Sequence, residues 1–214
     1  NYLIKIIFNS SKFKIYFNYK MKITVLSDIH GNLVALEKVF KKEHDSDLYF
    51  IIGDTVNYGP WSEDCVQYLN SKKNILNMKG NHEVYFIKKY CSVKNLLVKE
   101  FFYHSIKDFK SFKLINKYLR FKNFNNYRFI HTIKNKYIYD DTILNFNIKS
   151  NYFIGHTHCQ YHIKKNNYSI INPGSVGQNR NRIEEINYIN IINSKIFFKK
   201  MTYDLNHVIS EMKK

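Results

Sequence analysis

The chain is poor in the residues that mark disulfide-rich or membrane-spanning proteins. It has 214 residues, with only three cysteines and two prolines. Cys65, Cys91 and Cys159 form an odd and scattered set, which argues against a disulfide framework and favours reduced thiols in a cytoplasmic protein. No hydrophobic run reaches the ~18 apolar residues of a membrane-spanning helix, so we expect no association with membranes.

Linkers and repeats are also lacking. No Ser/Gly-rich stretch divides the chain, and no sequence repeats at a fixed period. With 44% hydrophobic residues, a chain of this length can enclose one sizeable core. We therefore expect a single domain over residues 21–214. Residues 1–20 hold short apolar stretches broken by polar residues, and we interpret them as an N-terminal appendage of unknown role.

Arginine is scarce although the chain is strongly basic. The formal net charge is +17, yet only four of the 34 basic residues are arginine. The lysine excess accompanies many Asn, Ile, Tyr and Phe residues, a bias that AT-rich coding produces, so the charge need not reflect selection for a partner. In either case a basic surface attracts phosphate esters and favours nonspecific adhesion to nucleic acid at low salt.

Five short segments carry histidine, carboxylate or amide side chains where a hydrophobic run ends. They are residues 27–32, 53–60, 80–83, 130–132 and 155–158. The runs before them read as strands, and open α/β sheets place reactive groups beyond the carboxyl ends of their strands. We therefore expect the five segments to meet in space.

These segments hold seven candidate metal ligands, which mix hard oxygen donors with imidazole. Such a set suits manganese, iron, zinc or nickel better than calcium or magnesium alone. Two ions about 3.5–4 Å apart can share a hydroxide, lower its pKa and clamp the oxygens of a displacement at phosphorus. We expect two divalent ions, manganese first, with nickel, iron, zinc or magnesium as alternatives. The seven ligands are Asp28, His30, Asp54, Asn81, His131, His156 and His158.

In these motifs the chain resembles the calcineurin-like metallophosphoesterases of the small bacterial and archaeal phosphodiesterase type. The blocks D-x-H, G-D, G-N-H-E, H and G-H-x-H occur in family order, and the phrase NPGSVGQNR follows at residues 172–180. The resemblance implies a four-layer αββα sandwich of two mixed β-sheets flanked by helices. It also implies hydrolysis of phosphate esters, most of all phosphodiesters, by a metal-bridging hydroxide.

The resemblance further implies a role for each residue. One ion would be held by Asp28, His30 and His158, the second by Asn81, His131 and His156, with Asp54 bridging them. His82 would assist catalysis, because an imidazole with a pKa of ~6.5 can protonate a departing oxygen near neutral pH. His131 is followed by Thr132, where family members often have Gly or Ala.

Arg180 is a candidate for substrate binding. It follows the Pro- and Gly-containing segment 172–177, which turn chemistry alone would also explain. The planar guanidinium fork of arginine binds phosphate at two points. We expect the partner molecule to be a small phosphate ester or a nucleotide, and the protein to be a monomer or a small homo-oligomer.

Two other functions remain open. One is a scaffold of the same fold without catalysis, like the retromer subunit that lost its catalytic histidine; the presence of His82 disfavours it. The other is a nucleic-acid-binding protein or nuclease, for which the basic charge is the only direct feature. No helix-turn-helix, RNA-binding signature or zinc finger supports that second alternative.

Hydrophobic periodicity predicts alternating strands and helices up to residue 78, a lysine- and aromatic-rich helical stretch from about 84 to 121, and a strand-rich remainder. Asn193 and Ser194 are expected to form a hairpin turn between the last two strands. Asp204 is expected to cap a short C-terminal helix.

Overall fold

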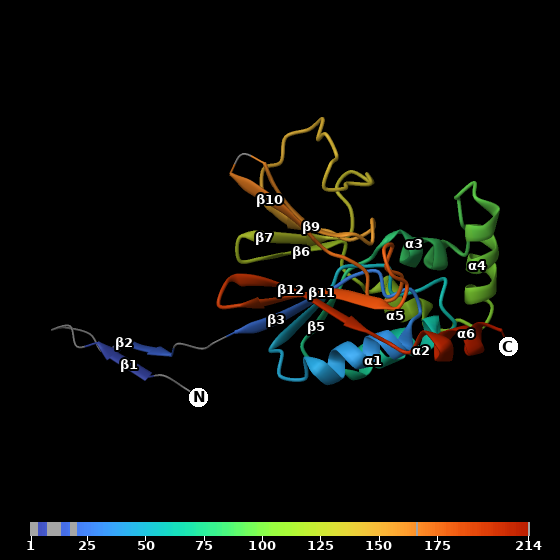
Figure 1. Cartoon of the computed structure of the whole chain (residues 1–214), viewed down its shortest axis with the longest axis horizontal. Helices are drawn as coiled ribbons and strands as arrows, with labels where there is room; N and C mark the ends of the chain where they lie inside the picture. Colours follow the sequence, from blue (N-terminus) through green and yellow to red (C-terminus); the bar gives the residue numbers. More distant parts are fainter. Residues whose placement is uncertain (1–3, 8–13, 18–20, 166, 214) are drawn as a thin grey trace.

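The computed structural model describes residues 4–7, 14–17, 21–165 and 167–213. Strands β1 (Ile4–Ile7) and β2 (Lys14–Phe17) pair with each other in an antiparallel sheet. The remainder of the expected N-terminal appendage lies outside the described residues. From Met21 onward the chain forms two five-stranded sheets (Figure 1).

The first sheet has the order β12-β11-β3-β4-β5. Its parallel part comprises β3 (Lys22–Leu26), β4 (Leu48–Ile51) and β5 (Ile75–Asn77). Helices α1 (Leu33–Lys42) and α2 (Ser62–Ser71) make the two crossovers between these strands. The antiparallel part is formed by β11 (Glu185–Ile192) and β12 (Lys195–Thr202).

The second sheet has the order β6-β7-β8-β10-β9. It begins with a hairpin of β6 (Phe121–Phe124) and β7 (Tyr127–Ile130), continues with the parallel strand β8 (Asn151–Phe153), and ends with β10 (Tyr168–Pro173) and β9 (Gln160–Lys165). Both sheets therefore mix parallel and antiparallel pairs.

The two sheets pack through their apolar faces because strand residues alternate between two sides. Ile23 and Val25 of β3 lie in the core between the sheets, whereas Leu26 lies in the core beneath α1. The rings of Phe50 in the first sheet and Phe129 in the second stack with centroids 3.9 Å apart. This aromatic contact fixes the two sheets against each other.

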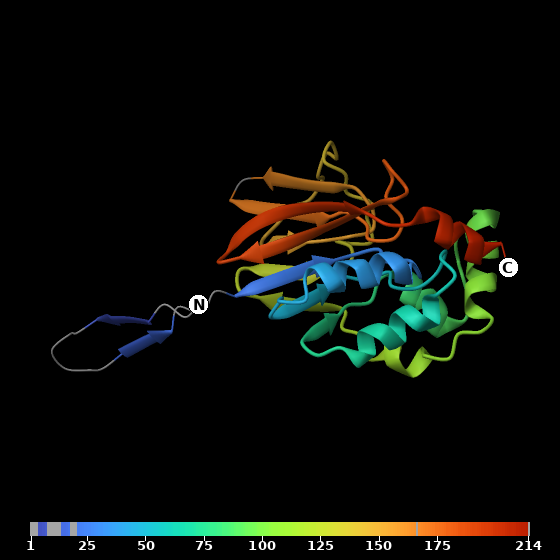
Figure 2. The ribbon, with the colours of Figure 1, turned by 60° about the horizontal axis from the view of Figure 1, so that its bottom comes forward.

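The outer faces of the sandwich are covered in two ways. Helices α1 and α2 lie along the outer face of the first sheet (Figure 2). The second sheet is covered by residues 131–150, whose Ile133, Ile138 and Leu144 pack with Ile154 and Ile170. The predicted class, two mixed sheets flanked by helices, is confirmed, with an irregular loop as the outer cover of the second sheet.

The predicted helical stretch of residues 84–121 is divided into α3 (Asn81–Lys88), α4 (Leu96–Ile106) and α5 (Phe112–Asn116). Lys89 ends α3 in the left-handed conformation, with φ 53°, and Asn95 begins α4 by accepting a hydrogen bond from the Val98 N–H. Strand β6, which the sequence did not predict, owes its pairing to the partner strand β7. Hydrophobic periodicity along the sequence predicts neither the break between α3 and α4 nor the pairing of β6 with β7.

Two smaller predictions are confirmed. Asn193 and Ser194 join β11 and β12 with φ of 50° and 64°, the left-handed pair that a tight hairpin requires. Asp204 caps α6 (Leu205–Met212) by accepting hydrogen bonds from the N–H groups of Asn206 and His207.

None of the helices in residues 21–165 and 167–213 combines the length and hydrophobicity that a bilayer crossing requires.

A buried carboxylate joins α1 to the first sheet. Glu43, at the end of α1, forms an ion pair with Lys22 Nζ at 2.7 Å. It also accepts hydrogen bonds from Tyr188 Oη at 2.6 Å and Asn190 Nδ2 at 2.9 Å. Burial alone would raise the pKa of Glu43, but these three partners outweigh it and lower the pKa below its ordinary value.

We predict that Glu43→Gln destabilises the fold by about 2 kcal/mol at pH 7, the contribution of hydrogen bonds to a charged group. Because the folded-state pKa of Glu43 is lowered, its contribution is present above its ordinary value of 4.5 and is lost as the pH falls below it. Urea unfolding at pH 7 and pH 4 measures this, with the exposed Glu37→Gln as control. An unchanged acid dependence in Glu43→Gln would contradict the assignment.

Candidate metal centre

The structure brings the seven predicted ligands to one end of the sandwich, where strands of both sheets stop. Asp28 and His30 follow β3, and Asp54 follows β4. The remaining ligands come from the start of α3 and from the segments after β7 and β8, namely Asn81, His131, His156 and His158. The catalytic candidate His82 comes from the same first turn of α3.

Five of these ligands have a left-handed backbone. This conformation is uncommon for residues other than glycine and carries a conformational cost. It turns the chain sharply in the segments that follow the strands. The φ values are 53° for Asp28, 49° for His30, 55° for Asp54, 74° for His156 and 61° for His158.

Asp28, His30 and His158 form the first group. Their ligand atoms lie within 4.8 Å of one another, and the two imidazoles meet with Nε2 atoms 3.1 Å apart. Behind the rings, His30 Nδ1 faces the Val56 carbonyl at 3.3 Å and His158 Nδ1 faces the Gln178 carbonyl at 2.7 Å. Since a carbonyl only accepts, both Nδ1 atoms donate, and the Nε2 lone pairs are left for the cluster.

Asp54, His131 and His156 form the second group. His131 Nε2 lies 3.0 Å from Asp54 Oδ2 and 3.2 Å from the amide oxygen of Asn81, while its Nδ1 donates to the Ile52 carbonyl at 2.9 Å. Burial alone would lower the pKa of His131, but the Asp54 carboxylate outweighs it and raises the pKa to about 10. Burial and the neighbouring His131 lower the pKa of His156 to about 4.

His82 borders both groups. Its Nε2 lies 3.9 Å from Asp54 Oδ2, and its ring meets His30 edge-on at 5.1 Å. Its other nitrogen, Nδ1, lies 2.8 Å from Asn57 Nδ2. An amide nitrogen donates, so a neutral His82 accepts this bond at Nδ1 and keeps its proton on Nε2, toward the cluster. Asn57 was not predicted, although it lies in the same segment as Asp54.

The donor set fits divalent metal ions. Burial, together with His158 and His82, lowers the pKa of His30 well below its ordinary value, so its ring is neutral. When His158 is neutral as well, two lone pairs face each other 3.1 Å apart, and a cation between them satisfies both. Oxygen and neutral imidazole donors together suit first-row divalent metals. The structure places His131, whose neighbour Thr132 departs from the family pattern, between Asp54 and Asn81.

Two glycines allow the strand-end loops to approach the ligands. A Cβ on Gly80 would overlap the Asp54 carboxylate, and a Cβ on Gly155 would overlap the Ser27 hydroxyl. The segment after β10 adds a third loop, in which the Ser175 hydroxyl donates to the Asp28 carbonyl at 2.7 Å. Any side chain at the two glycines would push these loops apart.

Glu83 holds the second group together from behind. Its buried carboxylate accepts hydrogen bonds from the backbone N–H groups of Gly80, Asp54 and Thr55 at 2.7, 2.9 and 2.6 Å. One side chain therefore fixes the segment of Asp54 against the first turn of α3. Burial and the charge of Asp54 raise the pKa of Glu83 to about 7, and the bond from Gly80 opposes that rise.

Two tyrosines flank the metal centre and were not predicted. Tyr137, from the loop over the second sheet, stacks on His156 with centroids 3.9 Å apart. Tyr58 meets His30 and His82 at 4.9 and 5.0 Å. Burial and Asp54 raise the pKa of Tyr58 to about 12, with Arg180 opposing. Arg180 itself is exposed, and its charge opposes the rise in the pKa of both tyrosines.

Comparison with known proteins agrees with this geometry. The family model described as calcineurin-like phosphoesterase matches residues 21–194. The chain belongs to the calcineurin-like phosphoesterase family. Membership supports hydrolase activity, and three overlapping histidine and carboxylate groups, the two above and His30 with Asp54 and His82, support binding of divalent metal ions.

Individual relatives differ in how much they match. Uncharacterized protein MJ0912 of Methanocaldococcus jannaschii is 27% identical over 91% of this chain and 93% of its own length. A symmetrical bis(5'-nucleosyl)-tetraphosphatase of Buchnera aphidicola is 33% identical over only 35% of this chain and 28% of its own length. A metallophosphoesterase crystal structure from Sphaerobacter thermophilus superimposes with a TM-score of 0.76 at 22% identity, covering 91% of this chain and 94% of that one. This last likeness shows the fold alone.

We predict that Glu83→Gln weakens metal binding by roughly 10- to 100-fold, as loss of a group that orients ligands does. The new amide nitrogen would face backbone N–H donors and release Asp54 from the start of α3. Titration of metal-free protein with manganese measures the change.

Glu63→Gln is a matched control for this variant. Glu63 also accepts backbone hydrogen bonds, from the N–H groups of Lys110 and Ser111 at 2.8 and 2.9 Å, but it contacts no ligand of the centre. Equal loss of manganese affinity in both variants would mean that Glu83 acts through general stability.

Proposed function

We propose that this protein hydrolyses phosphate esters, preferentially phosphodiesters, with two divalent metal ions, manganese first. The convergence of seven predicted donors on one end of the sandwich, with imidazole Nε2 atoms turned inward, is the observation that carries the proposal. The Buchnera relative acts on bis(5'-nucleosyl) tetraphosphates by its name, so nucleotide esters belong among the substrates to test.

Each donor has a proposed role. Bound there, two divalent ions would polarise a phosphoryl group and lower the pKa of water so that it attacks phosphorus near neutral pH. Asp54, whose Oδ2 lies beside His131 and whose carboxylate also neighbours His82 and His30, would bridge the two positions. The first position would be formed by Asp28, His30 and His158, and the second by Asn81, His131 and His156.

His82 and Arg180 would act on the substrate directly. His82 keeps its proton on Nε2 because Asn57 donates to Nδ1, and this N–H can donate a hydrogen bond to the oxygen that leaves phosphorus and stabilise its developing charge. Arg180, whose charge reaches Tyr58 and Tyr137, would bind a nonbridging phosphate oxygen at the mouth of the site.

The scaffold alternative is less well supported. A scaffold would not need a buried His82 whose Nδ1 is held by Asn57 and whose Nε2 faces Asp54. The nucleic-acid alternative rests on net charge alone. Steep salt dependence of binding without ester hydrolysis would favour it over the proposed activity.

We predict that His82→Ala lowers kcat by at least about 100-fold, the effect of removing one hydrogen-bond donor from the developing charge, while both metal ions remain bound. Metal-stripped protein is reloaded with manganese, nickel, zinc or magnesium and assayed with bis(p-nitrophenyl) phosphate and p-nitrophenyl phosphate. Metal content is measured in parallel, with the exposed His44→Ala as control. Loss of metal together with activity would make His82 a ligand, and absence of hydrolysis with every metal would refute the proposed activity.

We predict that Arg180→Ala raises KM several-fold with metal content intact, because a charge-assisted contact to phosphate is lost. Arg182→Ala is the control, since the Arg182 guanidinium is already engaged by Glu184 at 2.6 Å. Steady-state kinetics with the manganese-loaded protein measure both. Unchanged kinetics in Arg180→Ala would remove this residue from the site.

A further inference from the structure

The metal centre opens into a cavity of about 730 Å³, a size typical of sites for nucleotide-sized ligands. Asn81, His131 and His156 lie at one part of its wall. The cavity therefore holds much more than one phosphate group. The residues along its remaining walls indicate which chemical groups the rest of the substrate should carry.

The Lys, Arg, Asp and Glu side chains that line this cavity are all basic among the described residues. Lys79, Lys88 and Arg120 line it, and no aspartate or glutamate does so among the described residues. Lys79 Nζ donates to the Asn116 carbonyl at 2.8 Å. Lys88 and Arg120 make no hydrogen bond or ion pair with any residue that the structure describes. Two unpaired cations in a concave wall without carboxylates attract an anion.

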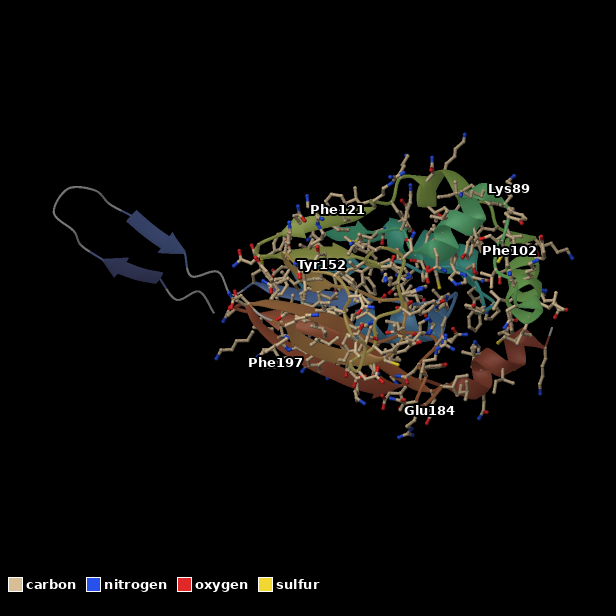
Figure 3. The ribbon with its side chains drawn as sticks, turned by 90° about the horizontal axis from the view of Figure 1, so that it is seen from above. Lys89, Phe102, Phe121, Tyr152, Glu184 and Phe197 are labelled. Atoms are coloured by element: carbon tan, nitrogen blue, oxygen red, sulfur yellow. The ribbon has the colours of Figure 1, made fainter. Side chains whose placement is uncertain are left out.

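Helix α3 sets the spacing between the metal centre and Lys88. Asn81, Tyr85 and Lys88 are positions i, i+4 and i+7, so they lie along one face of the helix, and all three line the cavity. Seven residues of helix rise by about 10 Å. Tyr85, whose ring lies 5.6 Å from that of His82, stands between the two ends. Figure 3 shows Lys89, the neighbour of Lys88, on the same side of the molecule as Phe102 of α4.

We propose that Lys88 binds a second phosphate group of the substrate, separated from the reacting phosphate by a nucleoside-sized spacer that lies along Tyr85. Arg120 adds positive charge to the same cavity. Two phosphates in an anhydride share one oxygen and lie side by side, so their separation is much shorter than the helix rise of about 10 Å between Asn81 and Lys88. This assignment rests on the proposed function, because it takes the metal centre as the site of the first phosphate.

Calorimetric binding to the manganese-loaded protein tests this proposal without relying on turnover. The ligands are thymidine 5'-monophosphate, thymidine 3',5'-bisphosphate and thymidine 5'-diphosphate, at equal free manganese. We expect the 3',5'-bisphosphate to bind roughly tenfold more tightly than the monophosphate, the effect of one charge-assisted hydrogen bond. The 5'-diphosphate, whose phosphates are adjacent, should gain less.

Substitutions at position 88 then test whether Lys88 causes the preference for the bisphosphate. Lys88→Ala should remove the tenfold gain of the bisphosphate, and Lys88→Arg should retain it. Lys42→Ala, an exposed lysine at the end of α1, should also retain it. Equal binding of monophosphate and bisphosphate, an undiminished gain in Lys88→Ala, or a larger gain for the 5'-diphosphate would each overturn the proposal.

Failure of this proposal is distinguishable from failure of the proposed function. A preference for the bisphosphate that depends on Lys88, without hydrolysis of any ester, would uphold the second phosphate site and refute the enzymatic activity. Hydrolysis of bis(p-nitrophenyl) phosphate without a preference for the bisphosphate would uphold the enzymatic activity and refute the second phosphate site.

Discussion

The concentration of electron-pair donors at one end of the sandwich is the constraint on which the other features of the site depend. The Nδ1 atoms of His30, His131 and His158 face backbone carbonyls, and this contact from behind turns each Nε2 inward. Such an arrangement is unfavourable without positive charge at its centre. The Asp54 carboxylate raises the pKa of His131 to about 10, and the same electrostatic bias favours a cation among these donors.

Holding these donors in place requires strain that the surrounding structure must oppose. Non-glycine residues with positive φ cost of order 1–3 kcal/mol each where the surroundings force them, and five ligands have this conformation. The core between the two sheets, which includes the stacked rings of Phe50 and Phe129, packs one sheet on the other. Glu83 then binds three backbone N–H groups where the loops meet. The rigid sandwich thus makes a strained site possible.

The sequence indicated the fold class and the ligand set because both leave local traces. Strand runs ending in glycine and a ligand, as at Gly53 and Asp54, show where a sheet edge lies. Contacts between distant segments leave no such trace. Asn57 becomes a partner of His82 only when α3 packs beside the segment after β4, and Tyr137 reaches His156 only through the loop over the second sheet. The roles of the ligands remain predictions, since geometry alone does not test them.

The basic composition has different meanings at different places on the molecule. A lysine excess that follows codon bias would place positive charge over the whole surface, with acidic residues interspersed, as at Lys22 beside Glu43 and Asp45. The cavity beside the metal centre departs from that pattern, because cations line it without any carboxylate among the described residues. The absence of carboxylates from that wall, more than the net charge, is the local feature on which the proposed second phosphate site depends.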